Sequence, residues 1–398
     1  MCREQGSLLH EFIYHTGMRR PVYTFFLIYL FITPLCADVR VATFNIAMGF
    51  EQAGQMRAAL ESGNHARLQG VATVLQRVRP EIVLLNEFDY DPSVDAAGLL
   101  NDNYLSRGSN PIRYEFHFRA PVNTGVDSGL DLDGDGETGG PGDAWGFGHF
   151  PGQYGMLVLS RFPLAAEPAR TFRDFRWSEM PDASMPVHAD GTPFYPQETW
   201  NRLRLSSKSH WDLAIDLDGV ELHLLASHPT PPVFDGEEDR NGRRNHDEIR
   251  FWRDYTDPAG IDWIVDDGGA VGSLGKNKRF IIAGDLNADP HDGDSRAGAI
   301  SQLLDAPWID ASCVPSSTGA AEASREQGGV NTRHKGDPAH DTADFNDRYT
   351  GNLRIDYLLP SAGLNVSRCG VFWPVAGLLD DDPSGVSDHR LVWMDLEF

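Results

Sequence analysis

Two short polar motifs contain the residue types best suited to catalysis. Asp285 and Asn287 are separated by one residue and follow an apolar segment at residues 280–284. Side chains two positions apart in an extended chain project from the same face, so this acid and this amide can address one ligand. Asp388 and His389 stand ahead of another apolar segment, and they combine an oxygen that can bind a metal with a group that can transfer a proton.

Three more polar residues follow apolar segments that are typical of strands: Asn45, Glu87 and His228. The strands expected ahead of them cover residues 39–44, 82–85 and 220–227. A single acid at a strand end is usually a turn former or a helix cap, and a single histidine is usually a structural hydrogen-bonding residue. Repetition of the arrangement along the chain favours instead one shared site, built on loops above a rigid core.

The elements that would position these residues alternate between strand and helix. A helix is expected between the first two strands, where apolar residues from Leu68 to Val78 recur at spacings of three and four before Pro80 ends the pattern. Further strands are expected at residues 154–160, 213–217, 354–359 and 391–396. The alternation is typical of α/β folds, and we predict one domain of two packed sheets over residues 38–398.

The composition excludes several classes of protein. The 398 residues are 41% hydrophobic, which is typical of a globular chain and not of a disordered one. The 58 acidic residues outnumber the 34 basic ones, and no basic run occurs, so we expect no strong nucleic-acid-binding patch. Chemistry on a phosphate group would therefore need a metal ion to supply positive charge.

The first 37 residues form an N-terminal extension with the pattern of a signal peptide. A pair of arginines precedes an apolar stretch at residues 22–35, and we expect cleavage near Ala37 and a periplasmic or secreted protein. The stretch has 14 residues, whereas a membrane-spanning helix needs about 20, so no stable membrane span is predicted. Lipid attachment at Cys36 is a weaker alternative, and either Met1 or Met18 is the true start.

Two cysteines would remain after cleavage, Cys313 and Cys369. Cysteines in an exported chain more often pair than stay free, so a disulfide between them is predicted. Two buried thiols are the alternative.

An acidic insertion resembles the start of a calcium loop. Asp131, Asp133 and Asp135 occupy the first, third and fifth positions, and glycine occupies the sixth. The twelfth position is Gly142 where an EF-hand has glutamate, so the segment predicts either a structural Ca²⁺ site of another kind or a flexible acidic turn. The glycine-rich and aromatic stretch that follows, up to residue 150, would either line a substrate cleft or simply pack.

The segment at residues 229–250 follows His228 and carries four arginines and a histidine. A cationic rim that faces a phosphate is one interpretation. The favoured interpretation is a solvated helix start with mixed charges.

Taken in order, the polar motifs resemble those of the endonuclease/exonuclease/phosphatase superfamily over residues 39–398. The motifs are Ala42-Thr43-Phe44-Asn45, Leu85-Asn86-Glu87, Leu159-Ser160-Arg161-Phe162-Pro163, Ser227-His228, Gly284-Asp285-Leu286-Asn287-Ala288-Asp289-Pro290, Arg354-Ile355-Asp356-Tyr357 and Ser387-Asp388-His389. The resemblance implies a four-layer α/β/β/α sandwich of two mixed β-sheets flanked by helices, which agrees with the alternation of strands and helices.

The resemblance also implies a role for each polar residue. Glu87, Asn45 and Asp388 would hold Mg²⁺, with Mn²⁺ or Ca²⁺ as alternatives, because hard cations prefer oxygen ligands. The catalytic residues would be His228, Asp285, Asn287, Asp356 and His389. Asp356 would orient His389, Asp285 would position and activate the attacking water, and Asn287 would stabilise charge on the phosphoryl oxygens. His228 would contact the scissile phosphate or protonate the leaving oxygen. Structural alternatives are a turn for Asn45 and, for Asp356, a pairing with Arg354, Arg390 or a backbone amide.

Two differences from the motifs of known branches reduce the number of branches of the superfamily that the chain resembles. Apurinic endonucleases carry Pro-Asn where this chain has Pro229-Thr230, which disfavours abasic-site repair. Deoxyribonucleases pair the second histidine with a glutamate, where the nearest residues here are Gln153 and Tyr154. We therefore predict an exported, monomeric, divalent-metal-dependent phosphoesterase that hydrolyses phosphomono- or phosphodiesters of a small organic phosphate, a lipid head group or a nucleic acid. The alternatives are an extracellular nuclease of the deoxyribonuclease type and a catalytically inactive, calcium-stabilised binding protein.

Overall fold

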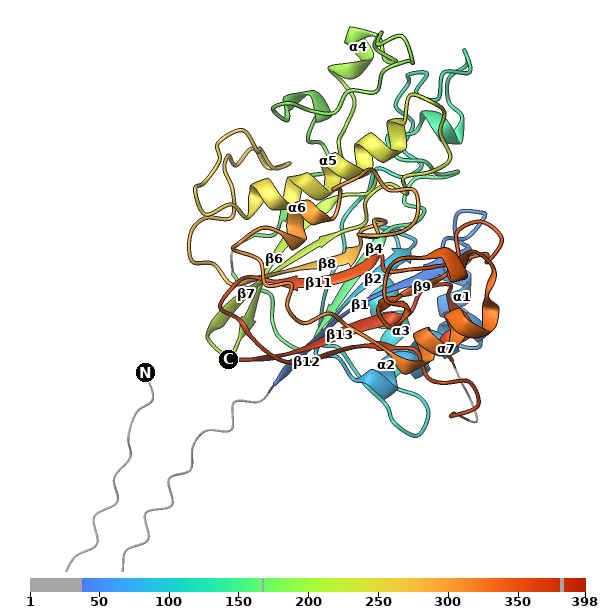
Figure 1. Cartoon of the computed structure of the whole chain (residues 1–398). Helices are drawn as coiled ribbons and strands as arrows, with labels where there is room; N and C mark the ends of the chain where they lie inside the picture. The colour runs from blue at the N-terminus through green and yellow to red at the C-terminus, as the bar shows by residue number, and fades with distance from the viewer. Residues whose placement is uncertain (1–37, 167, 380–382) are drawn as a thin grey trace, which may run out of the picture. The chain divides into compact units, whose positions relative to one another are not determined.

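Two mixed β-sheets form the centre of the protein (Figure 1). The computed structural model describes residues 38–166, 168–379 and 383–398, which belong to one compact unit. The predicted signal peptide, residues 1–37, lies outside the described residues and stays a prediction.

The first sheet has six strands in the order β12, β13, β1, β2, β4, β3. Their bounds are β1 (Val39–Met48), β2 (Ile82–Phe88), β3 (Phe116–Phe118), β4 (Met156–Ser160), β12 (Asn365–Phe372) and β13 (Leu391–Glu397). β1 and β2 run parallel, and the other neighbours are antiparallel.

The second sheet has five strands in the order β11, β8, β7, β6, β5. Their bounds are β5 (Arg170–Thr171), β6 (His210–Leu217), β7 (Val220–Ser227), β8 (Phe280–Asp285) and β11 (Asp356–Pro360). β7 and β8 form its parallel pair. A separate pair of two-residue strands consists of β9 (Ala343–Asp344) and β10 (Asn352–Leu353).

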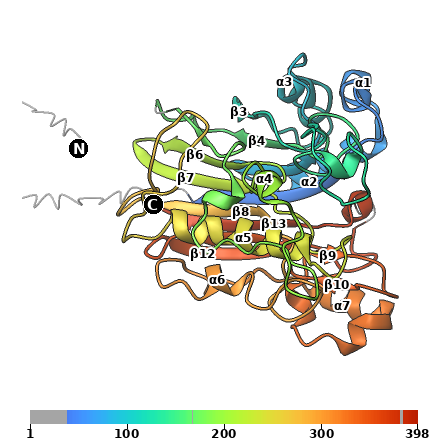
Figure 2. The same cartoon turned by 90° about the horizontal axis from the view of Figure 1, so that it is seen from above.

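Helices flank both sheets, as Figures 1 and 2 show. They are α1 (Gln55–Ser62), α2 (Ala66–Val78), α3 (Ala96–Leu100), α4 (Gln197–Trp200), α5 (Arg240–Tyr255), α6 (Ser301–Leu304) and α7 (Thr318–Gln327). Short π or 3₁₀ turns are Asn101–Leu105, Pro141–Asp143, Trp177–Glu179, Gly329–Arg333, Pro338–His340 and Ser384–Val386. No helix of the described residues is both long and apolar enough to cross a membrane.

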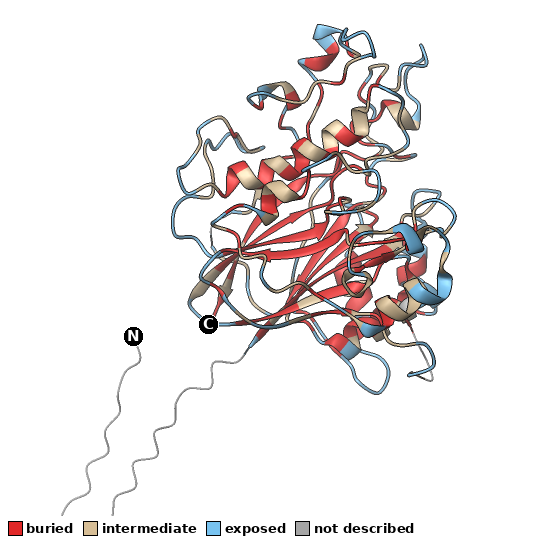
Figure 3. Ribbon diagram, viewed as in Figure 1, coloured by how far each residue is buried: buried red, intermediate tan, exposed pale blue. Residues whose placement is uncertain are grey.

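Alternation along the strands produces three apolar layers. Figure 3 shows that the strands of both sheets are largely buried. In β1, Val41 faces the core between the sheets, and Phe44 packs outward with residues of α1, α2 and α3. In the second sheet, Leu224 faces the core between the sheets, and Leu225 packs outward with residues of α5 such as Trp252. Successive side chains of a strand point to opposite faces, so each sheet buries both faces. The predicted four-layer α/β/β/α sandwich is confirmed.

The strand bounds differ from the prediction near the site. β1 continues past Asn45 to Met48, and β2 includes Glu87, so these polar residues lie within strands and not after them. β4 begins at Met156 and not at Tyr154, because Tyr154 has a left-handed backbone with a φ of 54°, which interrupts an extended chain.

A disulfide joins Cys313 to Cys369 of β12. The two Cα atoms are 6.3 Å apart, and the cysteines are 56 residues apart in sequence. A cross-link of this separation stabilises a fold by a few kcal/mol in the chain-entropy model, roughly 3–5 kcal/mol.

Candidate active site

Asp285 is the centre of a buried polar cluster at the end of β8, and it is only 1% exposed. Its Oδ1 accepts a hydrogen bond from the backbone N–H of Asn287 at 2.9 Å, and its Oδ2 accepts one from Nδ2 of Asn45 at 3.0 Å. Nε2 of His228 lies 3.4 Å from the same Oδ2, and Nε2 of His389 lies 3.7 Å from it. One carboxylate oxygen thus meets an amide and two imidazoles from three other segments of the chain.

Asn86 joins the two sheets beside this cluster. Its Oδ1 accepts a hydrogen bond from the backbone N–H of Asp285 at 3.2 Å, and its Nδ2 donates to the carbonyl of Ser227 at 3.3 Å. The ends of β2, β7 and β8 are therefore held at one place by a fully buried amide. The residue type alone predicted no role for Asn86, because a buried and an exposed asparagine look the same in a sequence.

His389 is oriented by hydrogen bonds on the side away from Asp285. Its Nδ1 lies 2.9 Å from Oδ2 of Asp356, and Oγ1 of Thr342 donates to that oxygen at 2.8 Å. All of these side chains are buried. The hydrogen-bond partners of Asp356 are thus a histidine and a threonine, and not the arginine of the structural alternative. Because Nδ1 of His389 faces Asp356, its Nε2 faces Asp285 and the centre of the site.

Neighbouring carboxylates keep His389 protonated. Burial by itself would lower the pKa of His389, but the charges of Asp356 and Asp285 outweigh burial and raise that pKa well above its usual range. Burial likewise opposes ionisation of Asp285, yet the imidazoles of His389 and His228 hold the pKa of Asp285 below its usual range. Burial raises the pKa of Asp356 to about 6.

A pH-dependent stability follows from this protonated histidine. A group whose pKa is higher in the folded state stabilises fully below its unfolded pKa, about 6.5 for histidine, and the stabilisation is lost as pH rises toward the folded pKa. In EDTA, we expect the free energy of unfolding of the wild type to fall more steeply above pH 6.5 than that of His389→Gln. The difference in slope is at most about 1.4 kcal/mol per pH unit, because one proton is involved. Urea unfolding at several pH values measures both slopes, and equal slopes would contradict the assignment.

Glu87 offers an oxygen ligand beside Asp285, whereas Asn45 directs its amide nitrogen to both carboxylates, and its Oδ1 accepts a hydrogen bond from the backbone N–H of Ala47 at 3.0 Å. Nδ2 of Asn45 lies 3.1 Å from Oε1 of Glu87 and 3.0 Å from Oδ2 of Asp285, so two carboxylates converge on one amide. Glu87 is partly exposed, which leaves this side open to solvent and substrate. The carboxylates of Glu87 and Asp285 are oxygen donors of the kind that Mg²⁺ prefers, and they fit a hard divalent cation. The predicted role of Asn45 as a ligand does not fit, because its amide nitrogen faces these carboxylates. Asp388, the third predicted ligand, has an exposed side chain next to His389.

Three residues around the cluster hold left-handed backbone conformations. The φ angles of Ala47, Glu87 and Asn287 are 48°, 57° and 52°. Such conformations cost residues other than glycine on the order of 1–3 kcal/mol each, and they gather where a site requires a particular side-chain direction. Their concentration at the ends of β1, β2 and β8 indicates that this edge of the sandwich is built for function.

The buried polar side chains of α5 hold the loops that carry the site residues of the second sheet. Glu248 accepts hydrogen bonds from the backbone N–H groups of Ser207 and Thr230, both at 2.6 Å. Asn245 donates through Nδ2 to the carbonyls of Thr230 and Leu286, both at 2.9 Å. The loops after β7 and β8 are therefore fixed by one helix.

The other predicted residues have clear partners as well. Asn287 donates through Nδ2 to the carbonyl of Pro229 at 3.1 Å. Gln153 bonds to backbone groups of the chain, at 2.7 Å to the N–H of His149 and at 2.6 Å to a carbonyl. The carboxylate nearest to the ring of His228 is consequently that of Asp285, and Nδ1 of His228 is buried without a hydrogen-bond partner among the described residues.

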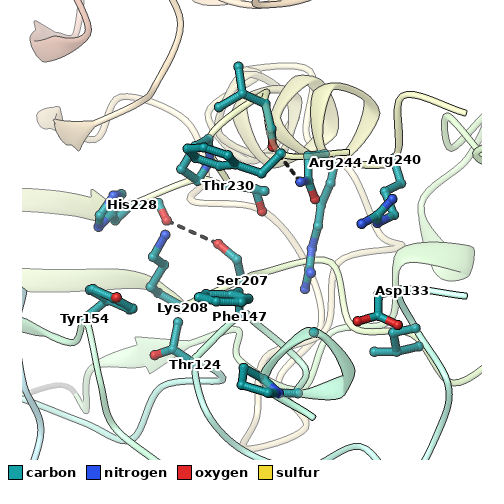
Figure 4. Close-up of a pocket in the computed structure, with 18 of the residues that line it drawn as sticks. Thr124, Asp133, Phe147, Tyr154, Ser207, Lys208, His228, Thr230, Arg240 and Arg244 are labelled. Atoms are coloured by element: carbon teal, nitrogen blue, oxygen red, sulfur yellow. Dashed lines mark hydrogen bonds between the residues drawn. The ribbon is translucent and has the colours of Figure 1, made fainter. Parts of the chain in front are cut away.

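A pocket of about 780 Å³ opens beside the cluster (Figure 4). Three predicted site residues line it, Glu87 and His228 of the polar cluster and Asp133 of the acidic insertion, together with Lys208. The pocket identifies the accessible side of the site, because His389 and Asp356 lie deeper and do not line it.

Lys208 belongs to the site although the sequence did not predict it. It is 6% exposed, and its ammonium group forms no ion pair or hydrogen bond with the other described residues. Figure 4 shows its side chain extending toward His228. Burial lowers the pKa of Lys208, although the carboxylates of Glu248 and Glu87 oppose that shift. A buried, unpaired cation that faces a pocket is suited to bind an anion. In the sequence it stands between two serines and looks like part of an exposed loop.

The acidic insertion forms a cluster that differs in one member from the predicted loop. The carboxylates of Asp131, Asp133 and Asp143 lie within 4.8 Å of one another, whereas Asp135 is not in this group. Asp143 is brought in from outside the predicted loop, and its Oδ1 accepts a hydrogen bond from the backbone N–H of Leu132 at 2.8 Å. A structural Ca²⁺ here stays a prediction.

The favoured interpretation of residues 229–250 as a solvated helix start holds only in part. The helix α5 does begin there, at Arg240, but Arg240 and Arg244 both line the pocket. Arg244 donates to the carbonyls of Leu205 and Trp145, at 2.8 and 2.5 Å, and so joins the helix to two loops.

A comparison with models of protein families identifies the family to which the chain belongs. A family model described as "Endonuclease/Exonuclease/phosphatase family" matches residues 42–389. The chain belongs to this family. Members of the endonuclease/exonuclease/phosphatase family are hydrolases that act on phosphoesters. The match includes every predicted site residue, from Asn45 to His389.

Solved structures similar to this chain have low sequence identity to it. An endonuclease/exonuclease/phosphatase from Beutenbergia cavernae has 18% sequence identity and a TM-score of 0.49, over 91% of this chain and 72% of its own. Sphingomyelinase C from Streptomyces griseocarneus has 18% identity and a TM-score of 0.44, over 90% and 99%. TDP2 from Caenorhabditis elegans has 15% identity and a TM-score of 0.43, over 91% and 74%. No curated protein sequence matches the chain.

Proposed function

We propose that the protein is an exported, divalent-metal-dependent phosphoesterase that hydrolyses its substrate by in-line attack of water. The observation that carries the proposal is the convergence on Oδ2 of Asp285, where the amide of Asn45 and the imidazoles of His228 and His389 meet. Membership of a family of phosphoester hydrolases supports it. Export is supported by the signal pattern of residues 1–37 and by the disulfide, which is typical of an oxidising compartment.

Each residue near Asp285 has a role that follows from its protonation state. Asp285 is ionised, so its carboxylate can accept a hydrogen bond from the attacking water and then its proton. His389 is protonated and directs Nε2–H toward the centre of the site, where it can donate to a phosphoryl oxygen. His228 is neutral because burial lowers its pKa, and it is placed to hydrogen-bond an oxygen of the phosphate. Lys208 adds positive charge from the pocket side.

The positive charge that the acidic chain lacks would come from a divalent cation. Glu87 would hold it, with Asp388 as the second candidate ligand, and the Asn45 amide would orient the Glu87 carboxylate by its hydrogen bond. The bound cation would neutralise charge on the phosphoryl oxygens. The residues of the chain would then orient the water and the phosphate for an in-line displacement.

The direct test is hydrolysis of a chromogenic phosphodiester and of its monoester by the purified protein, with Mg²⁺ and with EDTA. We expect turnover with Mg²⁺ and a loss of at least about a hundredfold in EDTA, because the cation supplies several kcal/mol of charge stabilisation. Preference for the diester would direct attention to nuclease or lipid substrates, and preference for the monoester to small organic phosphates. Undiminished activity in EDTA, with no tightly held ion in the protein, would overturn the metal assignment.

A further inference from the structure

The pocket beside the site is larger than a phosphate group requires. Its volume of about 780 Å³ lies within the range of roughly 300–1,000 Å³ that is typical of sites for whole small molecules. His228 and Lys208 lie at one side of the pocket, and Asp133 and Arg240 lie at the opposite side (Figure 4). A substrate whose phosphate lies between His228 and Lys208 would therefore place its organic group in the remainder of the pocket.

The part of the pocket away from His228 and Lys208 has mostly apolar walls. They combine side chains from three separate segments, including Leu132, Trp177, Tyr195 and Leu203. The hydroxyl of Tyr195 donates a hydrogen bond to the carbonyl of Leu132 at 3.3 Å, so Tyr195 lines the pocket mainly with the apolar part of its ring. A polyol would lose its hydrogen bonds to water against such walls and form few new ones with the apolar side chains. Burial of an apolar or aromatic group there would be favourable, because its surface is removed from water.

Two exposed aromatic residues also line the pocket. Phe147 is 59% exposed and Phe234 is 88% exposed, and they come from different loops. Five large hydrophobic residues of the described chain are this exposed, and the other three, Val271, Tyr349 and Leu378, do not line the pocket. Single exposed hydrophobics need no explanation, but two aromatic rings at one pocket are suited to cover a flat ligand.

A second cation lies within reach of such a ligand. Arg244 extends into the pocket between its two sides (Figure 4). Its Nε and Nη2 donate to backbone carbonyls, among them those of Leu205 and Trp145, and none of its hydrogen bonds goes to a carboxylate of the described residues. The guanidinium thus has carbonyl partners and only the electrostatic effect of the Glu248 carboxylate, without a direct ion pair among the described residues. Beside the apolar walls it would favour a ligand with a hydrogen-bond acceptor or a stacking ring.

We propose that this pocket binds the organic group of the phosphoester substrate, and that this group contains an aromatic ring and not a polyol. The inference rests on the proposed function for the position of the phosphate. It extends that function by assigning the substrate class to aryl or heteroaryl phosphoesters, with Phe147 and Phe234 as the residues that select them.

Binding of phosphonates that cannot be hydrolysed tests the proposal without relying on turnover. Calorimetry on the full chain with Mg²⁺ would compare naphthylmethylphosphonate with methylphosphonate. We expect the aryl compound to bind at least about tenfold more tightly, because its ring is removed from water in the pocket. The double variant Phe147→Ala/Phe234→Ala should reduce this preference to less than about threefold. The matched control is Tyr349→Ala, which removes a ring that is 76% exposed and does not line the pocket, and it should keep the full preference.

The outcomes separate the substrate class from the proposed function. Equal affinity for both phosphonates, or a preference that survives in the double variant, would overturn the substrate class even if the enzyme hydrolyses phosphoesters. If the protein prefers the aryl phosphonate but hydrolyses no phosphoester, the assignment of the pocket to aromatic groups stands and the proposed function is overturned. Because the two phenylalanines are exposed, their replacement leaves the core intact, and a folded double variant is expected.

Discussion

Replacement of Asp285 by asparagine is expected to reduce kcat/KM for phosphoester hydrolysis by at least about a thousandfold. Its Oδ2 is the point on which Asn45, His228 and His389 converge, and its negative charge is what would orient and deprotonate the attacking water. Asparagine keeps the shape but cannot accept a proton. The measurement is steady-state hydrolysis of the chromogenic substrate with Mg²⁺, together with thermal unfolding of the same samples.

The chain offers a closely matched control for this variant. Asp212 is also buried, and its carboxylate meets Nδ1 of His223 at 2.6 Å and the hydroxyl of Tyr255 at 2.6 Å, in a cluster that contains none of Asn45, His228 and His389. We expect Asp212→Asn to lose stability, because it breaks a buried carboxylate and imidazole pair, and to keep kcat/KM within about threefold where it is folded. Similar activity losses in the two variants would mean that Asp285 acts through stability alone.

Replacement of Lys208 by methionine is expected to lower kcat/KM by at least about a hundredfold without loss of stability in the presence of Mg²⁺. The ammonium group is buried and unpaired among the described residues, so its desolvation destabilises the folded protein. Binding of an anion beside the ammonium group would offset this destabilisation. Methionine has a similar length and no charge. It would fill the same space and leave the phosphate without this contact.

The pH profile adds a second readout for Lys208. Burial lowers the pKa of Lys208, so its charge is lost at a lower pH than that of an exposed lysine. Wild-type activity should therefore begin to fall at a lower pH than the activity of Lys208→Met, in which the remaining alkaline decline reflects loss of the proton of His389. The control is Lys278→Met, since Lys278 is partly exposed and its Nζ lies 2.6 Å from Oε1 of Glu221. Activity of Lys208→Met within threefold of the wild type would exclude an anion-binding role.

Much of the fold was predictable because local pattern and tertiary packing agree. The alternation of apolar residues in β1, β7 and β8 and the helical spacing from Leu68 to Val78 identify elements that bury both faces of each sheet. The order of the polar motifs was sufficient to predict the family. What failed locally were strand bounds near the site. The left-handed backbone of Tyr154 delays the start of β4, whereas β1 and β2 continue past the expected ends at Phe44 and Leu85.

The sequence by itself determined which acids, amides and imidazoles are present and that they are associated with apolar strands, because those properties are local. Only the tertiary structure decided which of them meet. Asn86 joins the sheets, Asp143 replaces Asp135 in the acidic cluster, and Lys208 becomes a buried cation in a pocket. Each of these depends on contacts between segments far apart in the chain, and a side chain's burial, partners and charge state follow from those contacts and not from its neighbours in sequence.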